Sequence, residues 1–287
     1  LGQMDALNSL ATFAYNHPGY SYPTLLDKAD MIAAKAGIPS GAKDADTENT
    51  DGNAHFMLRA KALGHPLMHR DRCVRNDIDM EKRPFFIIIT GANMGGKSVV
   101  MKTVALNVLL LQAGFLVCAK KARMPLFYSV KMLFDDLQSI QSGLSGFGSE
   151  IVQFQKALEE VEQGYSLFLL DEFARGTNPD EGAVIVQAVT KYLNEVKAIS
   201  LLTTHYDKVA ENARLHYQII GLRDVDPEQI RQELAATGDD GIQVIARHMN
   251  YGLYRVEGKS DCPRDALNIC RMLSLKPEIL EKIEQAY

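Results

Sequence analysis

A glycine-rich turn within Thr90–Val100, TGANMGGKSVV, restricts the fold of this chain more than any other stretch of its sequence. It follows the run FFIIIT (residues 85–90), which is apolar on both faces, as is typical of a central strand in a parallel sheet covered by helices. It precedes residues 98–112, which place apolar groups at helical spacing and end before Gly114. The sequence therefore predicts a strand, a glycine turn and a helix in one βα unit.

The spacing inside this turn is that of a phosphate-binding loop. The pattern G-x-x-x-x-G-K-[ST] runs from Gly91 to Ser98, in the strand-to-helix position that the pattern requires. Glycines lack a β-carbon, so backbone N–H groups can surround a phosphate, and the positive end of the following helix attracts the same anion. We expect Lys97 to reach the β- and γ-phosphates and the Ser98 hydroxyl to bind Mg²⁺. The alternative is a tight turn that carries a lysine by chance.

Two further apolar runs indicate that the strand and helix pattern repeats. SLFLLDEF (residues 166–173) follows a helix-like segment at 150–162, and AISLLTTH (residues 198–205) follows another at 181–194. Alternating strands and helices favour an α/β sandwich with a mainly parallel sheet.

The two ends of the chain differ from this core. Residues 1–16 place apolar groups at helical spacing and predict one amphipathic helix, whereas residues 37–53 are polar and glycine-rich and predict a mobile loop. Near the other end, residues 251–258 alternate like an edge strand, and residues 264–273 and 277–285 predict two short helices. We therefore expect short helical elements at both termini.

Charged and polar side chains stand where two of the apolar runs end. Asp171 and Glu172 follow the second run, at the strand end where open α/β sheets bind their ligands. Asp171 fits the acid that holds Mg²⁺ through water, and Glu172 fits the base that polarises an attacking water. His205 ends the third run and is expected at the same edge, to sense a γ-phosphate or orient water. The alternatives are a solvated acidic strand end and a structural histidine.

Composition narrows the classes of function. The formal net charge of −5 gives no overall attraction to nucleic acid, and no local basic patch is evident. No window has about 18 uncharged apolar residues and the N-terminal stretch does not resemble a signal peptide, so we expect a cytoplasmic protein without a membrane contact. The four cysteines form no zinc-binding pattern and are interpreted as buried or idle thiols. The chain begins at Leu1, and we expect it to be part of a longer protein.

Taken together, TGANMGGKS, LFLLDEFARGTNPDEG and LLTTHY resemble, in this order and spacing, the ATPase domain of the MutS family, which is related to ABC-type ATPases. The core N-M-G-G-K-S separates MutS relatives from other phosphate loops, and Ala92 departs from the proline usual in the family. The resemblance spans nearly the whole chain and implies a P-loop NTPase fold, a three-layer α/β sandwich. It implies that ATP and Mg²⁺ are bound here, and that the nucleotide is contacted by Gly91, Ala92, Asn93, Met94, Gly95, Gly96, Lys97, Ser98 and Val99.

The resemblance also implies a dimer. DDLQSIQSGLSGFGSE resembles the family segment that ends in S-T-F and acts as an ABC-like signature, so Ser145 is expected to contact the γ-phosphate of the partner subunit's nucleotide. Gly146 stands in place of the threonine, and the alternative is an ordinary serine and glycine loop. The loop at 175–182, RGTNPDEG, resembles the family loop that crosses the dimer interface. A homodimer with two composite ATP sites follows.

The family pattern suggests a division of the chain into three parts. Residues 1–76 resemble the end of the family's lever region leading into the core, residues 77–222 the ATPase core, and residues 223–287 a C-terminal strand and helical pair used in dimerisation. DCPR, residues 261–264, stands where D-S-Y-G is typical.

Two outputs for the ATPase remain open at this stage. The first is a DNA transaction, mismatch repair or recombination control, with DNA contacts supplied by segments absent from this chain. The second is a chaperone-like reactivation of a cobalamin-dependent aminomutase, suggested by DEFARGTNPDEG and by the acidic charge balance. The N-P-D-E-G ending is closer to the MutS-like branch without mismatch recognition. A degenerate nucleotide-binding scaffold is a third option, disfavoured by the intact lysine, aspartate and glutamate.

Overall fold

The fold was analysed in a computed structural model of the chain. Its described residues are 2–17, 19–25, 58–80, 86–91, 96–134, 146–196, 198–206, 209–213, 215–237, 241–257 and 265–286. The loop predicted at 37–53 and the DCPR segment lie outside these residues.

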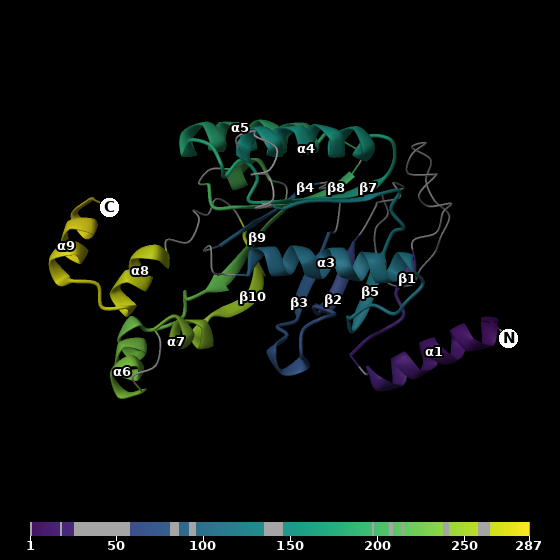
Figure 1. Cartoon of the computed structure of the whole chain (residues 1–287), viewed down its shortest axis with the longest axis horizontal. Helices are drawn as coiled ribbons and strands as arrows, with labels where there is room; N and C mark the ends of the chain where they lie inside the picture. Colours follow the sequence, from purple (N-terminus) through teal and green to yellow (C-terminus); the bar gives the residue numbers. More distant parts are fainter. Residues whose placement is uncertain are drawn as a thin grey trace.

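A mainly parallel six-stranded sheet forms the centre of the protein (Figure 1). Its strand order is β10-β9-β4-β8-β7-β6, and only the edge strand β10 runs antiparallel to its neighbour. Every residue of β4 and β8 is buried, which explains their continuous apolar sequences. The strands are β4 (Phe86–Thr90), β6 (Val130–Leu133), β7 (Ser166–Asp171), β8 (Ala198–Thr204), β9 (Leu215–Gly221) and β10 (Asn250–Arg255).

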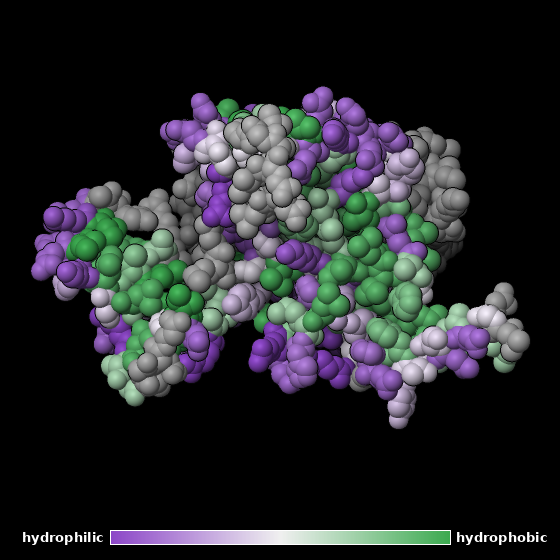
Figure 2. Space-filling view, in the orientation of Figure 1, coloured by the Kyte–Doolittle hydropathy of each residue, from purple (hydrophilic) through white to green (hydrophobic). Residues whose placement is uncertain are grey.

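Helices cover both faces of this sheet. On one face, α4 (Gly146–Val161) and α5 (Pro179–Leu193) form a layer whose solvent side is largely hydrophilic (Figures 1 and 2). On the other face lies α3 (Lys97–Gln112). Successive residues of β4 alternate between the two cores, since Ile87 packs on the α3 side and Ile88 on the α4 and α5 side. The predicted three-layer α/β sandwich is therefore confirmed.

A smaller sheet with the order β1-β5-β2-β3 lies beside α3, and the sequence patterns did not predict it. Its central strand β2 pairs antiparallel with both β3 and β5. Strands β2 and β3, RAKAL and NDID, carry alternating charged residues, so they lack the apolar runs that revealed the main sheet. The strands are β1 (Thr24–Leu25), β2 (Arg59–Leu63), β3 (Asn76–Asp79) and β5 (Lys121–Met124), and the short helix η1 (Arg70–Arg72) lies between β2 and β3.

The C-terminal part forms a helical group beyond β10, which we call the C-terminal lobe (Figure 1). It contains α6 (Pro227–Thr237), α7 (Gly241–His248), α8 (Asp265–Met272) and α9 (Pro277–Ala286). Helices α8 and α9 and the edge strand β10 confirm the sequence prediction, whereas α6 and α7 were missed. Helix α1 (Gly2–Asn16) is also confirmed and lies at the opposite end of the molecule. The short helix η3 (Val209–Asn212) connects β8 to β9.

Candidate functional site

The carboxyl ends of three parallel strands meet at one edge of the main sheet. Thr90 of β4 is paired with Thr204 of β8, and Asp171 of β7 with Thr203 of β8. Gly91, Glu172 and His205 therefore all leave the sheet at this edge, as expected from the sequence. This is the side on which open α/β sheets bind ligands.

The structure describes both ends of the predicted phosphate-binding loop. Gly91 has a φ of 151° and Gly96 a φ of 82°, so both glycines adopt backbone conformations that side chains disfavour. Gly96 is the N-terminal cap of α3, whose first helical residue is Lys97. The loop residues between them, Ala92, Asn93, Met94 and Gly95, lie outside the described part of the chain.

Gly96 is also required by its contact with β10. A β-carbon at this position would lie 2.8 Å from Cδ1 of Tyr251. The carbonyl oxygen of Tyr251 accepts a hydrogen bond from Nδ2 of Asn76, at 3.3 Å, and Oδ1 of Asn76 accepts one from the N–H of Leu253, at 2.7 Å. One asparagine of β3 thus fixes the strand whose tyrosine packs on the phosphate-binding loop.

Lys97 is buried although it carries a positive charge. Its side chain is only 2% exposed, and its Nζ donates a hydrogen bond to the carbonyl oxygen of Gly91 at 2.7 Å. The same Nζ lies 3.2 Å from Oε1 of Glu172. A buried ammonium needs such acceptors, because an unpaired charge in the interior is costly. The structure thus brings together the lysine of the loop and the acid at the end of β7.

Glu172 is held from two sides. While Oε1 lies next to Lys97, Oε2 accepts a hydrogen bond from Nη1 of Arg175 at 2.8 Å. The backbone of Glu172 has a φ of 49°, and Ala174 has a φ of 63°, both unusual for residues with a side chain. Such conformations cost free energy and cluster at functional sites. The turn after β7 is therefore built to aim this carboxylate at Lys97.

Asp171 is positioned by a buried threonine that sequence reasoning did not single out. The Thr203 hydroxyl donates to Oδ1 of Asp171 at 2.6 Å, and Oγ1 of Thr203 accepts a hydrogen bond from the N–H of Glu172 at 2.9 Å. Thr203 is fully buried on the neighbouring strand β8. One hydroxyl therefore sets the positions of both acidic residues.

The remaining predicted residues are less closely connected. His205 packs its ring against Tyr206, with ring centroids 4.6 Å apart. Ser98 and Val99 occupy the first turn of α3, and Ser98 is half-buried while Val99 is exposed. Ser145 lies outside the described residues.

Helix α4, which begins directly after the Ser145 segment, contacts the turn that follows β7. Oε1 of Glu150 accepts a hydrogen bond from the N–H of Ala174 at 3.1 Å. The carbonyl oxygen of Ala174 in turn accepts a hydrogen bond from the Tyr206 hydroxyl, at 2.8 Å. The turn that carries Glu172 is therefore attached to α4 and to the end of β8.

These residues fit a nucleoside triphosphate with Mg²⁺. A phosphate oxygen can replace the acceptors that now surround the Lys97 ammonium, at the positive N-terminal end of α3. Within the described ranges, no group of three or more His, Cys, Asp and Glu side chains could hold a metal alone. Proteins hold Mg²⁺ with one or two carboxylates together with substrate phosphates. Asp171 and Ser98 are suitable ligands of this kind.

Two residues of the site, Thr203 and Arg175, were not predicted from the sequence. Both lie in quoted motifs, but a hydroxyl inside an apolar strand and an arginine in a loop are not signals of a site by themselves. Thr203 stands two residues before His205, so both side chains would project to the same side of an ideal strand. This spacing is the feature of the sequence that could have predicted Thr203 as a site residue. The contact of Arg175 depends on the unusual backbone of the turn.

Comparisons with known proteins agree with this geometry. The family model for MutS domain V matches residues 87–272. Endonuclease MutS2 of Thermomicrobium roseum is 37% identical over 160 residues, which cover 55% of this chain and 20% of that protein. Endonuclease MutS2 of Bacillus velezensis is 35% identical over 187 residues, 64% of this chain and 23% of that protein. Putative endonuclease MutS2 of Bacillus subtilis is 35% identical over 186 residues, with the same coverage, 64% and 23%.

What these matches show depends on how much of each protein they cover. The chain spans about a fifth to a quarter of the length of these relatives. The family model, in contrast, covers well over half of the chain and includes the Gly91–Ser98 loop, the end of β7 and the end of β8. The chain belongs to the MutS family, as a domain V.

Proposed function

We propose that this chain binds ATP with Mg²⁺ and hydrolyses it, as the ATPase unit of a MutS-like protein in the cytoplasm. The observation that carries the proposal is the buried Nζ of Lys97, 3.2 Å from Oε1 of Glu172, at the N-terminal end of α3. A lysine ammonium held between a glycine carbonyl and a carboxylate is suited to receive the oxygens of a triphosphate.

Each residue of the site has a distinct role in this proposal. Backbone amides from Gly91 to Val99 surround the phosphates, and Lys97 contacts the β- and γ-phosphates. Ser98 and Asp171 would hold Mg²⁺, which would neutralise charge on the phosphate oxygens. Thr203 keeps Asp171 oriented through the 2.6 Å hydrogen bond.

Glu172 acts as the base that polarises the attacking water, and His205 senses the γ-phosphate or orients that water. In the structure both carboxylate oxygens of Glu172 are engaged, one by Lys97 and one by Arg175. When Lys97 moves to the phosphates, Oε1 becomes available to accept a hydrogen bond from water. Water then attacks the γ-phosphorus in line with the leaving oxygen, and Lys97 spreads the developing negative charge.

We further propose that two copies of the chain form composite sites. Each site takes its phosphate loop, Asp171, Glu172 and His205 from one chain and Ser145 from the other. Residues 77–222 would form the ATPase core, with 1–76 leading into it and 223–287 serving dimerisation. The hydrogen bond from Ala174 to Glu150 supports a link between the site and α4, which directly follows Ser145.

The proposed output is a DNA transaction, because the relatives named above are called endonucleases. Since the chain spans only part of those proteins, the test uses the intact protein. Its ATPase rate is measured with and without Mg²⁺, and with and without duplex DNA. We expect an ATPase rate that requires Mg²⁺ and is higher with duplex DNA than without it. We also expect the affinity of the protein for DNA to fall steeply as the salt concentration rises. A rate indifferent to DNA, together with recovery of an aminomutase by affinity capture, would replace the DNA output by enzyme reactivation.

A further inference from the structure

We propose that Cys73 and Cys118 form a site of reversible oxidation, at which a peroxide converts the two thiols into an intramolecular disulfide. Both cysteines are free in the structure, and both lie beside Gly64, which directly follows β2. Their pairing is not suggested by the sequence, because a long stretch containing β3, β4 and α3 separates them. The proposal does not depend on the proposed function.

The missing side chain of Gly64 brings the two sulfurs close to each other. A β-carbon at Gly64 would lie 3.1 Å from Sγ of Cys73 and 3.1 Å from Sγ of Cys118. The two sulfurs are therefore separated by at most twice this distance, beside the backbone of Gly64. A disulfide bond of about 2 Å forms when the sulfurs move into that space.

Backbone hydrogen bonds hold both cysteines against the end of β2. The N–H of His65 donates to Sγ of Cys73 at 3.2 Å, and the N–H of Gly64 donates to the carbonyl oxygen of Cys118 at 2.7 Å. The buried Asn107 side chain completes the arrangement. Its Oδ1 accepts from the N–H of Cys118 at 2.7 Å, and its Nδ2 donates to the carbonyl oxygen of Gly64 at 3.0 Å.

A fixed positive charge lies next to the pair. Nη2 of Arg75 contacts Sγ of Cys118 at 3.7 Å, while Nη1 donates to the carbonyl oxygens of Gly19 and Ala62, each at 3.1 Å. The guanidinium is thus anchored by backbone groups from two other segments. The guanidinium favours the thiolate form of Cys118, which is the form that attacks a second sulfur.

The two thiols differ in ways that suit a two-step oxidation. Cys73 is partly exposed, whereas Cys118 is buried. Burial raises the pKa of the Cys118 thiol, although the Arg75 guanidinium opposes this effect. Cys73 is therefore the thiol that a small oxidant reaches, and Cys118 is the thiol that completes the disulfide.

The chemistry balances with hydrogen peroxide as the oxidant. The Cys73 thiolate attacks one peroxide oxygen, an S–O bond forms, the O–O bond breaks, and the leaving hydroxide takes a proton to become water. The Cys118 sulfur then attacks the sulfenic sulfur, the S–S bond forms, and the hydroxyl group leaves as water with the Cys118 proton. Two thiols and one peroxide give one disulfide and two waters.

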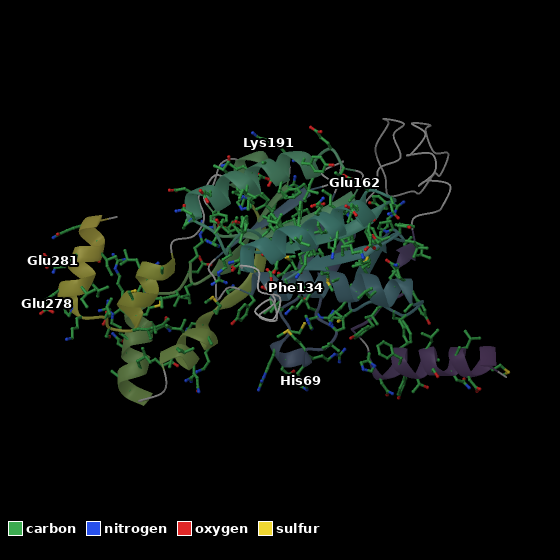
Figure 3. The ribbon with its side chains drawn as sticks, turned by 45° about the horizontal axis from the view of Figure 1, so that its top comes forward. His69, Phe134, Glu162, Lys191, Glu278 and Glu281 are labelled. Carbon is green, nitrogen blue, oxygen red and sulfur yellow. The ribbon has the colours of Figure 1, made fainter. Side chains whose placement is uncertain are left out.

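The location of Cys73 makes it accessible to such an oxidant. It directly follows η1 in the connection between β2 and β3, and His69 of that connection projects from the body of the protein in Figure 3. The side chain of His69 is 77% exposed.

A disulfide between Cys73 and Cys118 would restrict the unfolded chain over a long loop. We therefore expect the oxidised protein to unfold at a temperature several degrees higher than the reduced protein.

The test compares the whole chain with a variant in which Cys262 and Cys270 are replaced by serine. Both proteins are treated with a small excess of hydrogen peroxide, and mass spectrometry before and after dithiothreitol follows the oxidation. We expect each to lose two hydrogens, to give a tryptic species linking Cys73 to Cys118, and to return to the starting mass on reduction. Cys73→Ser and Cys118→Ala should each abolish the linked species.

Other results would overturn the proposal. One is accumulation of Cys73 with two added oxygens while Cys118 still reacts with an alkylating reagent. Another is a crosslink that joins two chains, visible as a dimer band without reductant. Should Cys118→Ala fail to fold, Cys73→Ser in the partly exposed position still tests the pairing, since persistence of a species linked through Cys118 in this variant would overturn it.

Discussion

The site edge of the main sheet and the C-terminal lobe are built on different principles. At the site edge, the buried Lys97 pairs with the largely buried Glu172, and the exposed Arg175 contacts the other oxygen of the same carboxylate. The lobe instead rests on a small apolar cluster, and none of the α9 side chains that the structure describes is buried. In Figure 3 the labelled Glu278 and Glu281 lie on α9, away from the main sheet.

This difference indicates that the site edge must be more rigid than the lobe. Buried charges tolerate little movement, because losing one partner leaves an unpaired charge in the interior. Strands β4, β7 and β8 supply that rigidity, since their ends are aligned by continuous parallel pairing. The lobe joins the main sheet through β10, whose Tyr251 packs on Gly96. Tyr251 also packs against the apolar cluster of the lobe. We therefore expect the site to depend more on its own residues than on the lobe, which contacts it through Tyr251.

Removing the buried ammonium should have the largest effect. Lys97→Ala should abolish detectable ATP binding, because the phosphates lose their main positive charge and Glu172 loses the partner of Oε1. Isothermal calorimetry with Mg²⁺ and ATP measures this directly. Lys131→Ala is the matched control, since Lys131 pairs with Glu160 on the surface and not with the site. Binding by Lys97→Ala equal to wild type would contradict the proposed site.

Neutralising the proposed base should separate binding from chemistry. Glu172→Gln keeps the shape of the side chain but removes its basicity, so turnover should fall by about 10²- to 10⁴-fold while ATP stays bound. Single-turnover hydrolysis and ATP retention check the two parts separately. Accumulation of a dimer in the presence of ATP is expected as well. Normal turnover would remove Glu172 from its role.

The sequence predicted the site edge better than the rest of the fold. The runs that became β4, β7 and β8 are apolar because both faces of each strand are covered, so their ends could be aligned from the sequence alone. Lys97 and Glu172 lie together as that alignment requires. The alignment did not predict the contacts of Thr203 and Arg175. The contact of Arg175 depends on the positive φ of Glu172, which leaves no mark in the residue pattern.

The small sheet and half of the lobe were missed for a different reason. Strand β3 reads NDID, and its charged side chains Asp77 and Asp79 are explained only by their partners on β2, Lys61 and Arg59. Helix α6 is mainly polar, and Ile230 is the single fully buried side chain among those that the structure describes in it. Elements that are stabilised by such pairwise contacts show only a weak periodicity of apolar residues in the sequence.

Truncating one buried side chain in the main sheet and one in the lobe should show how much each region contributes to ATP binding. Leu202→Ala in β8 and Ile230→Ala in α6 each empty a fully buried position, so each should cost about 2–5 kcal/mol locally. Leu202→Ala should lower the stability of the whole main sheet and weaken ATP binding. Ile230→Ala should increase hydrogen exchange in the lobe alone and leave ATP binding unchanged. Equal effects of both variants on ATP affinity would show that the lobe is part of the site.

The smallest expected effect concerns His216, on the strand between β4 and β10. Its Nε2 lies 2.7 Å from Oγ1 of Thr90, and burial lowers its pKa to about 4. A histidine that stays neutral when folded but takes a proton near pH 6.5 when unfolded adds stability above pH 6.5, which is lost as the pH falls toward 4. Between pH 7.5 and 5 the main sheet should therefore lose about 2 kcal/mol through this residue.

His216→Gln isolates this contribution, because glutamine does not titrate and retains a polar side chain. Urea unfolding at pH 7.5 and at pH 5 gives the free energy of unfolding of both proteins. The wild type should lose more stability than the variant over this interval, and hydrogen exchange should place the extra loss in β4 and β9 rather than in the lobe. If both proteins lost the same amount, His216 would have to carry a proton in the folded state at pH 5, in conflict with its burial between the strands of the main sheet.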